Sequence, residues 1–281
     1  MKRFAWIVAF ALVATLSCAA NVSAFDEFNL WPGVAPGEKD DAKKPTYEYW
    51  APAEKSTDAC LIVCPGGAYN GLAYAHEGGK IAEYFTSKGV TTVVLKYRVP
   101  RREGWSKHLA AWQDAQRMAR VVRSRAEEWG INPEKIGILG FSAGGHLTLM
   151  TATTSQTPAY EPIDELDKTP CNVNFAIPVY PAYVLKDGAN GSTPRTGTDP
   201  TMVDDFAFDE KTPPMCLIHG DADVCSPIGS ISVYSKLRKM GLPVEMHIYA
   251  KVGHGFGGNP TDDHVGDWLN RAYAWMKSIG L

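Results

Sequence analysis

Residues 136–146 read Ile-Gly-Ile-Leu-Gly-Phe-Ser-Ala-Gly-Gly-His, and this stretch decides the fold. A short apolar run, Ile136 to Leu139, leads directly into Gly-x-Ser-x-Gly and then into a helix-like segment. The two flanking glycines, Gly140 and Gly144, give the backbone room for a sharp turn. Such a turn lifts the Ser142 hydroxyl clear of a sheet and points the first N–H groups of a helix at the same spot. The stretch therefore predicts a nucleophilic serine at a strand-to-helix junction.

Strand-like and helix-like segments alternate along the rest of the chain. Residues 60–64 form an uninterrupted apolar run typical of a strand buried on both faces, and further strands are expected at residues 90–97, 175–180, 215–219 and 244–249. Helical patterns occupy residues 79–88, 107–129, 228–240 and 262–279. This alternation predicts one α/β domain with a mostly parallel sheet and helices on both faces.

Three further segments are expected to lie around this core. Residues 25–44 are rich in proline, glycine and acidic residues and predict a surface segment. Residues 46–50 alternate between polar and apolar types, which favours an edge strand. Residues 181–213 lose periodicity and fill with Gly, Asp, Thr and Pro, which indicates a long loop or small lid beside the site. The role of this loop stays open.

The composition excludes some partners. The chain has 281 residues, of which 45% are hydrophobic and 21% charged, and its net charge is -3, as is usual for a globular enzyme. With no basic stripe, no nucleic-acid partner is expected. The nearest cluster is interpreted as the solvated face of one helix: Arg117, Arg120, Arg123 and Arg125.

The N-terminal residues have the pattern of a targeting segment. Lys2 and Arg3 precede an apolar run, and Val22-Ser23-Ala24 provides the small residues of a cleavage site. This predicts a signal peptide over residues 1–24, a catalytic domain over residues 25–281, and export. The apolar run is too short for stable membrane insertion. A lipid anchor is a minor alternative, because the match to a lipoprotein signal is poor.

Five cysteines remain after the predicted cleavage: Cys60, Cys64, Cys171, Cys216 and Cys225. An odd number leaves at least one free thiol, and the sequence leaves any disulfide pairing open. Three of them lie in apolar runs and are expected to be small buried hydrophobes: Cys60, Cys64 and Cys216. No Cys-x-x-Cys or clustered His/Cys spacing indicates zinc, so neither a metal nor an organic cofactor is expected.

Residues suited to acyl transfer follow several predicted strands. Parallel sheets bind ligands outside the carboxyl ends of their strands, and Ser142, Asp221, Asp223 and His254 all follow strands. A serine hydroxyl is a poor nucleophile until an imidazole takes its proton, and a carboxylate orients that imidazole. The order Ser…Asp…His is that of the α/β-hydrolases. Either aspartate is in principle able to reach His254.

The same edge of the sheet supplies candidates for the remaining tasks. An oxyanion needs donors placed in advance, and backbone N–H groups of Ala143 and of Gly67 or Ala68 are the candidates. Tyr69, beside that loop, and Phe256, beside the candidate histidine, are expected to wall a small acyl pocket and bind substrate. The nearby pair His76 and Glu77 either shapes the loop or has a structural role only.

The chain resembles secreted α/β-hydrolase esterases of the acetyl esterase and acetylxylan-esterase-like type. The matching segments are CPGGAYNGLAYAHEG, LKYRVP, QDAQRMARVVRSRAEEWGINPEKIGILGFSAGGH, HGDADVCSP and EMHIYAKVGHGFG. The resemblance implies that Ser142 is the nucleophile, Asp223 the acid and His254 the base. Asp221 is then left to cap the turn. The chain departs from the Gly-Gly-Gly-Tyr oxyanion loop of this family by having Ala68 at the third position.

The resemblance implies a serine carboxylesterase that removes short acyl groups, acetyl above all, from carbohydrate such as acetylated xylan. The expected partner is a small-molecule or oligosaccharide ester, and the oligomeric state stays open. Two alternatives remain. One is a serine peptidase of the prolyl-oligopeptidase type, although such enzymes usually carry a large extra domain. The other is a non-catalytic hydrolase fold that binds carbohydrate or a partner.

Overall fold

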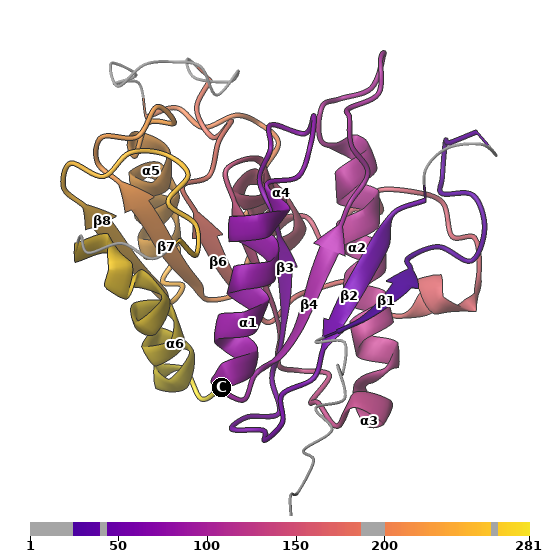
Figure 1. The fold of residues 1–281 in the computed structure, drawn as a ribbon. Coiled ribbons are helices and arrows are strands. Elements are labelled where there is room, and N and C mark those ends of the chain that lie inside the picture. The colour runs from indigo at the N-terminus through magenta and orange to yellow at the C-terminus, as the bar shows by residue number, and fades with distance from the viewer. Residues whose placement is uncertain (1–24, 40–43, 187–199, 260–263) are drawn as a thin grey trace, which may run out of the picture.

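The computed structural model describes residues 25–39, 44–186, 200–259 and 264–281; the predicted signal peptide lies outside them. Eight strands form one sheet in the order β1-β2-β4-β3-β5-β6-β7-β8 (Figure 1). The β1–β2 and β2–β4 pairings are antiparallel, and every other pairing is parallel. The strands are β1 (Asp26–Asn29), β2 (Thr46–Trp50), β3 (Cys60–Cys64), β4 (Thr91–Lys96), β5 (Ile136–Phe141), β6 (Phe175–Val179), β7 (Met215–Gly220) and β8 (Val244–Tyr249).

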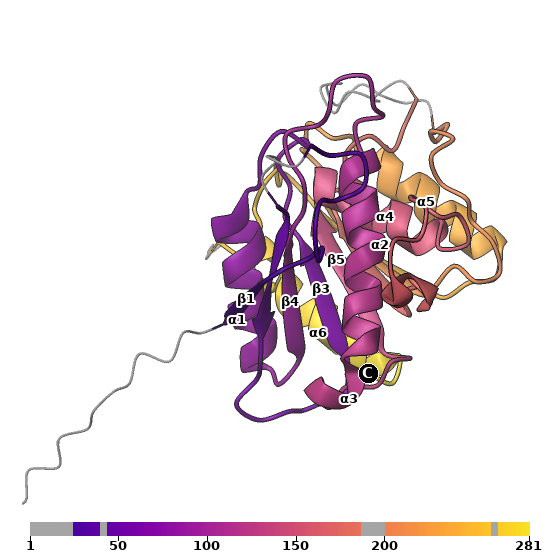
Figure 2. The ribbon, with the colours of Figure 1, turned by 90° about the vertical axis from the view of Figure 1, so that its right-hand side faces the viewer.

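Helices cover both faces of the sheet, as the turned view in Figure 2 shows. One layer contains α1 (Lys80–Ser87) and α6 (Trp268–Ser278), and the other contains α2 (Leu109–Ser124), α4 (Ala143–Thr153) and α5 (Ile228–Lys239). Short turns of helix complete the set: η1 (Ala75–Gly79), α3 (Ala126–Trp129), η2 (Glu165–Lys168) and η3 (His264–Asp267). The predicted α/β-hydrolase fold is confirmed. Among the described residues, no helix has both the length and the apolar character to cross a membrane.

Strand β3 explains why the sheet supports two cores. Its five residues are fully buried, and their side chains alternate between faces because successive residues of a strand point in opposite directions. Ile62 packs in the cluster that includes α2 and α4, whereas Leu61 and Val63 pack in the cluster that includes α1 and α6. The expected burial of the strand cysteines is confirmed, and all five described cysteines are free thiols.

The edge of the sheet differs from the prediction. Strand β2 is not an edge strand, because β1 pairs with it along its whole length, from Asp26 opposite Tyr49 to Asn29 opposite Thr46. Residues 25–44 therefore do more than cross the surface. The four residues of β1, Asp-Glu-Phe-Asn, carry no apolar alternation, and their strand conformation depends on the partner that they pair with.

The interpretation of the arginines on α2 as a solvated face is wrong. Only 3% of Arg117 and 9% of Arg120 are exposed, because the chain between α4 and β6 folds over this side of the helix. Arg117 forms ion pairs of 2.6 and 2.9 Å with Asp164 and Asp167 from that segment. The predicted single helix over residues 107–129 is also divided, since α2 ends at Ser124 and α3 follows.

A buried polar cluster fixes α2 to the end of β4. The Asp114 carboxylate accepts hydrogen bonds from the backbone N–H of Arg98 at 2.8 Å, from its Nε at 3.0 Å, and from Nε1 of Trp31 at 2.8 Å. Both charged side chains are fully buried. Burial raises the pKa of Asp114, and the Arg98 charge opposes that rise. The position of α2 beneath the site therefore depends on a paired buried charge.

Most of the segment predicted as a loop has no regular structure where it is described. An isolated β-bridge pairs Leu185 with Met202, so these two ends of the described segment lie next to each other. Residues 187–199, in the middle of the predicted loop, lie outside the described residues.

Candidate active site

Ser142 lies at the turn between β5 and α4, with φ 53° and ψ −115°. This conformation is strained for a non-glycine residue and persists only where the surrounding structure enforces it. A Cβ on Gly140 would lie 2.2 Å from the carbonyl oxygen of Gly144, and one on Gly144 would lie 2.1 Å from that of Cys64. The Gly-x-Ser-x-Gly glycines are thus required for the close packing of β3, β5 and α4 around the serine.

A continuous chain of contacts joins the serine to a histidine and an acid. Nε2 of His254, in the loop after β8, is 2.9 Å from the Ser142 hydroxyl oxygen. Its Nδ1 is 2.8 and 2.9 Å from the two carboxylate oxygens of Asp223, in the loop after β7. Loops that follow three parallel strands thus bring together residues distant in sequence, at hydrogen-bonding distance.

The acid is buried and the imidazole is partly exposed. Asp223 is fully buried, and its Oδ1 accepts a hydrogen bond of 2.6 Å from the backbone N–H of Cys225. Burial alone lowers the pKa of His254, but the hydrogen bond and negative charge of Asp223 outweigh it and hold the pKa above its usual value. A carboxylate in this position favours the tautomer with a proton on Nδ1, which leaves Nε2 free to accept the serine proton.

Asp221 is placed differently from the expectation that it caps the turn. Its side chain is exposed and makes no hydrogen bond with the described residues, whereas its backbone N–H donates to the Tyr249 carbonyl at 2.8 Å. The bond to a backbone N–H two residues further along is made by Asp223 instead, so one aspartate both closes the turn and contacts His254. The sequence could not separate these tasks because both aspartates follow the same strand.

The loop after β3 packs directly against the serine. A Cβ on Gly66 would lie 3.0 Å from the Ser142 Cβ, so the two backbones are adjacent. Gly67 has φ 132° and Ala68 has φ 55°, so the non-glycine residue at the third position adopts a left-handed conformation. Within the described ranges, the N–H groups of Ala68 and Ala143 have no protein acceptor. Unpaired N–H groups on either side of Ser142, one in the loop after β3 and one at the start of α4, are suited to bind an oxyanion.

A buried glutamate connects this loop to the histidine loop. Glu77, only 3% exposed, accepts hydrogen bonds of 2.8 Å from the N–H of Gly66 and 2.7 Å from the hydroxyl of Tyr180. The Tyr180 oxygen in turn accepts the N–H of Gly257 at 3.0 Å. The Tyr180 ring also lies 4.8 Å, between centroids, from the His254 ring. One carboxylate therefore holds two of the loops that carry candidate catalytic groups.

Tyr69 and Phe256 occupy different environments. Tyr69 is 1% exposed, and its hydroxyl is 2.9 Å from Nδ1 of His146. This placement corrects the expectation that Tyr69 walls an acyl pocket, because its left-handed backbone turns the ring into the protein beside Tyr183. Phe256 and His254 line a hollow of about 310 Å³, whose lining does not include Ser142. The Phe256 ring centroid lies 4.6 Å from that of Tyr180. A role of Phe256 in binding the acyl group stays a prediction.

The region that contains Ser142 and the loop after β3 matches a known family. A family model described as BD-FAE matches residues 48–204, more than half of the chain. The chain belongs to the BD-FAE family. A second model, described as the prolyl oligopeptidase family, matches residues 198–279, which include Asp223 and His254.

Relatives of this BD-FAE chain include esterases. The acetylxylan esterase of Xylanibacter ruminicola is 28% identical over 240 residues, which are 80% of this chain and 47% of that protein. The BD-FAE chain thus spans less than half the length of that relative.

Solved structures extend the likeness over nearly the whole chain. An acetyl ester-xyloside bifunctional hydrolase from Caldicellulosiruptor lactoaceticus has a TM-score of 0.77 and 28% identity, over 91% of this chain and 96% of that one. An esterase from Thermogutta terrifontis has a TM-score of 0.70 and 23% identity, over 93% and 96%, and shows the shared fold. The predicted resemblance to α/β-hydrolase esterases is confirmed.

Two residues of the BD-FAE site were not predicted. Tyr180 directly follows β6, at the same edge of the sheet as the serine, and that position was its only signal in the sequence. His219 is fully buried behind the acid, where Nε2 donates to the Cys225 carbonyl at 2.8 Å and Nδ1 accepts from the Ser230 hydroxyl at 2.8 Å. Burial lowers the pKa of His219 to about 4, so the ring is neutral and serves to hold the acid loop.

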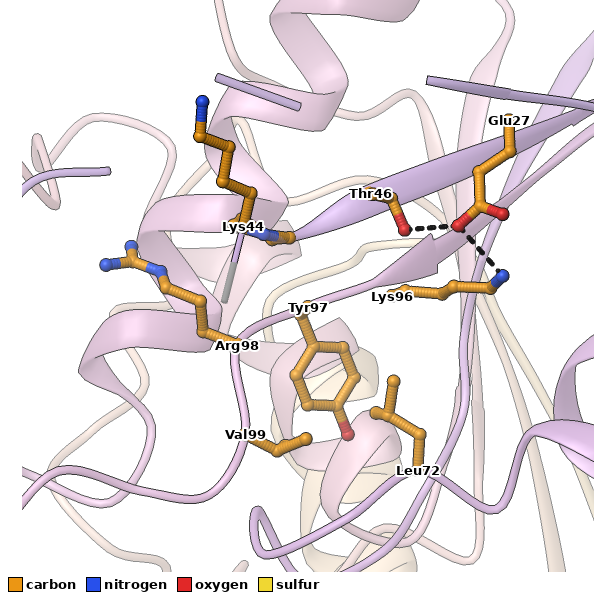
Figure 3. Close-up of a pocket in the computed structure, with 9 residues that line it drawn as sticks. Glu27, Lys44, Thr46, Leu72, Lys96, Tyr97, Arg98 and Val99 are labelled. Atoms are coloured by element: carbon orange, nitrogen blue, oxygen red, sulfur yellow. Dashed lines mark hydrogen bonds and ion pairs between the residues drawn. The ribbon is translucent and has the colours of Figure 1, made fainter. Parts of the chain in front are cut away.

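A second hollow of about 230 Å³ lies near the N-terminal strands of the BD-FAE fold (Figure 3). Figure 3 shows Glu27 between Thr46 and Lys96, with which it makes bonds of 2.6 and 3.0 Å. Arg98, also in its lining, is already paired with Asp114. Because Glu27, Lys96 and Arg98 are already paired with other side chains, this hollow is a poor candidate for the reacting ester.

Proposed function

We propose that this protein is a serine carboxylesterase that forms an acyl-enzyme through Ser142, His254 and Asp223. The single observation that carries the proposal is the unbroken contact from the serine oxygen through the imidazole to a buried carboxylate, at 2.9 and 2.8 Å. Catalytic nucleophile and base need this separation for proton transfer.

The proposed mechanism assigns one task to each group. His254 takes the Ser142 proton through Nε2 as the serine oxygen attacks the ester carbonyl, and Asp223 stabilises the resulting imidazolium. N–H groups of Ala143 and of Gly67 or Ala68 bind the oxyanion. The imidazolium then protonates the leaving alcohol, which leaves an ester on the serine. A water molecule, deprotonated by the same imidazole, hydrolyses that ester and restores the free serine.

The proposed substrate is a short acyl ester on carbohydrate, such as acetylated xylan or its oligosaccharides. The names of the acetylxylan esterase relative and of the acetyl ester-xyloside hydrolase support this choice. Export is part of the proposal and rests on the targeting pattern of residues 1–24.

A second candidate is a serine peptidase, which the match of residues 198–279 to the prolyl oligopeptidase family favours. The same three residues would cleave an amide by the same steps. A hydrolysis panel separates the two: acetylated xylan, a feruloylated sugar, nitrophenyl esters of rising chain length and a proline-containing peptide. We expect turnover of the acetyl esters. Cleavage of the peptide alone would support the second candidate.

A further inference from the structure

Three residues from distant parts of the chain converge beside α4. His108 directly precedes α2, His146 lies on α4, and Asp205 belongs to the segment between β6 and β7. One nitrogen of each imidazole and one carboxylate oxygen all lie within 4.8 Å of one another. Both histidines are buried, whereas the side chain of Asp205 is 31% exposed, which leaves access from solvent.

The two imidazole nitrogens that face the carboxylate lack hydrogen-bond partners. Nδ1 of His108 and Nε2 of His146 are buried, and no group in the described part of the chain satisfies either. They lie 3.6 and 3.4 Å from the same oxygen, Oδ2 of Asp205, too long or too poorly aligned for good hydrogen bonds. A buried polar atom without a hydrogen-bond partner needs a physical explanation. Two such atoms beside the same carboxylate point to one common explanation.

The spacing fits a metal ion between the three atoms. Ligands about 2.0–2.2 Å from a tetrahedral zinc lie roughly 3.3–3.5 Å from one another. The two nitrogen–oxygen separations, 3.6 and 3.4 Å, are close to this value. Two imidazoles and one carboxylate are also ligands that zinc and similar divalent ions accept. We propose that His108, His146 and Asp205 bind one divalent transition-metal ion of the zinc class.

An ordinary ion pair explains the cluster less well. The nitrogen–oxygen separations of 3.6 and 3.4 Å are longer than the 2.7–2.9 Å of a charge-assisted hydrogen bond, and both nitrogens lack a hydrogen-bond partner among the described residues. Imidazole nitrogens that carry no proton are the form that binds metals.

The neighbour of His146 matches what metal-binding histidines require. A metal-bound imidazole usually donates its other N–H to an oxygen, which fixes its orientation. Nδ1 of His146 is 2.9 Å from the hydroxyl oxygen of Tyr69, in a position to donate to it. Tyr69 directly follows Ala68, so the metal would stabilise the loop beside Ser142 while tying Asp205 to α2 and α4. The proposed metal ion has a structural role and takes no part in the ester chemistry.

No local pattern in the sequence indicates a metal here, because the ligands come from three segments far apart in the chain. Local spacings such as Cys-x-x-Cys report sites built within one turn or hairpin. Here two imidazole rings and a carboxylate meet only when the segment before β7 folds against α2 and α4.

Metal content of the full chain, purified without a histidine tag, tests the proposal. The protein is stripped with EDTA, dialysed against zinc and measured by elemental mass spectrometry, and the zinc Kd is determined by competition with a chelating dye. We expect one zinc per chain in the wild type and at least about 100-fold weaker binding in Asp205→Ala and His108→Asn. Free zinc at a thousand times the Kd is expected to raise the wild-type Tm by roughly 8–16 °C and to leave Asp205→Ala unchanged.

Two matched controls test the location. His247 lies near Glu245 and Cys216, but its Nε2 is already bonded to Glu245 at 2.8 Å, so His247→Asn is expected to keep the zinc. His254→Asn is expected to keep it as well, because the triad is a separate cluster. The proposal is overturned if the wild type binds no zinc, if Asp205→Ala binds it as tightly as the wild type, or if either control loses it.

Discussion

Replacement of Glu77 by glutamine tests how the site is held together. Both carboxylate oxygens of Glu77 accept hydrogen bonds, one from the Gly66 N–H at 2.8 Å and one from the Tyr180 hydroxyl at 2.7 Å. The Tyr180 oxygen already accepts the Gly257 N–H, so its own proton is committed to Glu77. A glutamine has one oxygen and one NH₂ group. In Glu77→Gln, the NH₂ group must face one of these two donors.

The expected magnitude follows from the loss of one charge-assisted bond at a buried site. Such a bond contributes about 1.5–3 kcal/mol, and the donor left facing NH₂ stays unsatisfied. For a domain of this size, a loss of about 2–3 kcal/mol corresponds to a Tm lower by roughly 4–12 °C. Loss of a whole oxyanion donor costs about 10²–10³ in kcat. Glu77 positions the loop after β3, which carries candidate oxyanion donors, but supplies no donor itself. We therefore expect kcat to fall about 10- to 100-fold, with a smaller change in KM.

Glu48→Gln is the matched control. Glu48 is also buried, and it accepts a tyrosine hydroxyl, that of Tyr74, at 2.6 Å and pairs with Lys96 at 2.6 Å, but it lies on β2. The control is expected to lose stability with kcat for a nitrophenyl acetate within about twofold of the wild type. Equal losses of kcat in the two variants, or an unchanged kcat in Glu77→Gln, would refute the reasoning.

Four further outcomes are expected. Asp223→Asn removes the charge that raises the pKa of His254, so the acid limb of the kcat/KM profile should move to lower pH while the rate falls up to about 10⁴-fold; a limb that stays in place contradicts this. Asp221→Asn should alter neither rate nor urea midpoint, since its side chain is exposed. Asp114→Ala should cost about 3–5 kcal/mol in urea unfolding, because it removes the fully buried partner of Arg98 and leaves Glu38, 3.3 Å away, as its remaining ion-pair partner; a cost under about 1 kcal/mol would contradict this. Finally, kcat/KM should fall steeply from acetyl to octanoyl nitrophenyl esters if Phe256 bounds a small pocket, and a flat series would argue against it.

The parts of the site that follow local rules could be predicted from the sequence. The strain at Ser142 needs glycines at fixed offsets, and the sequence displays them as Gly-x-Ser-x-Gly. Buried parallel strands such as Cys60–Cys64 are continuous apolar runs, so the sheet and its carboxyl edge follow from the pattern. Residues that follow those strands, among them His254, were therefore predicted to converge.

Features that depend on long-range partners could not be predicted. Strand β1 has no apolar pattern and exists through its pairing with β2. Arg117 looks like a solvated residue until Asp164 and Asp167 cover it. Tyr69 follows the oxyanion loop in the sequence, yet its positive φ directs the ring inward to His146. In each case the decisive contact comes from a segment whose position no local pattern specifies.

The most direct test of the central claim is the site of covalent labelling by a fluorophosphonate, mapped by peptide mass spectrometry. The reagent reacts with a serine only where a base and an oxyanion site activate it. We predict one adduct per chain, located on Ser142 and absent from Ser142→Ala. No adduct on the folded wild-type protein, or an adduct on another residue that persists in Ser142→Ala, would contradict the assignment of Ser142 as the nucleophile.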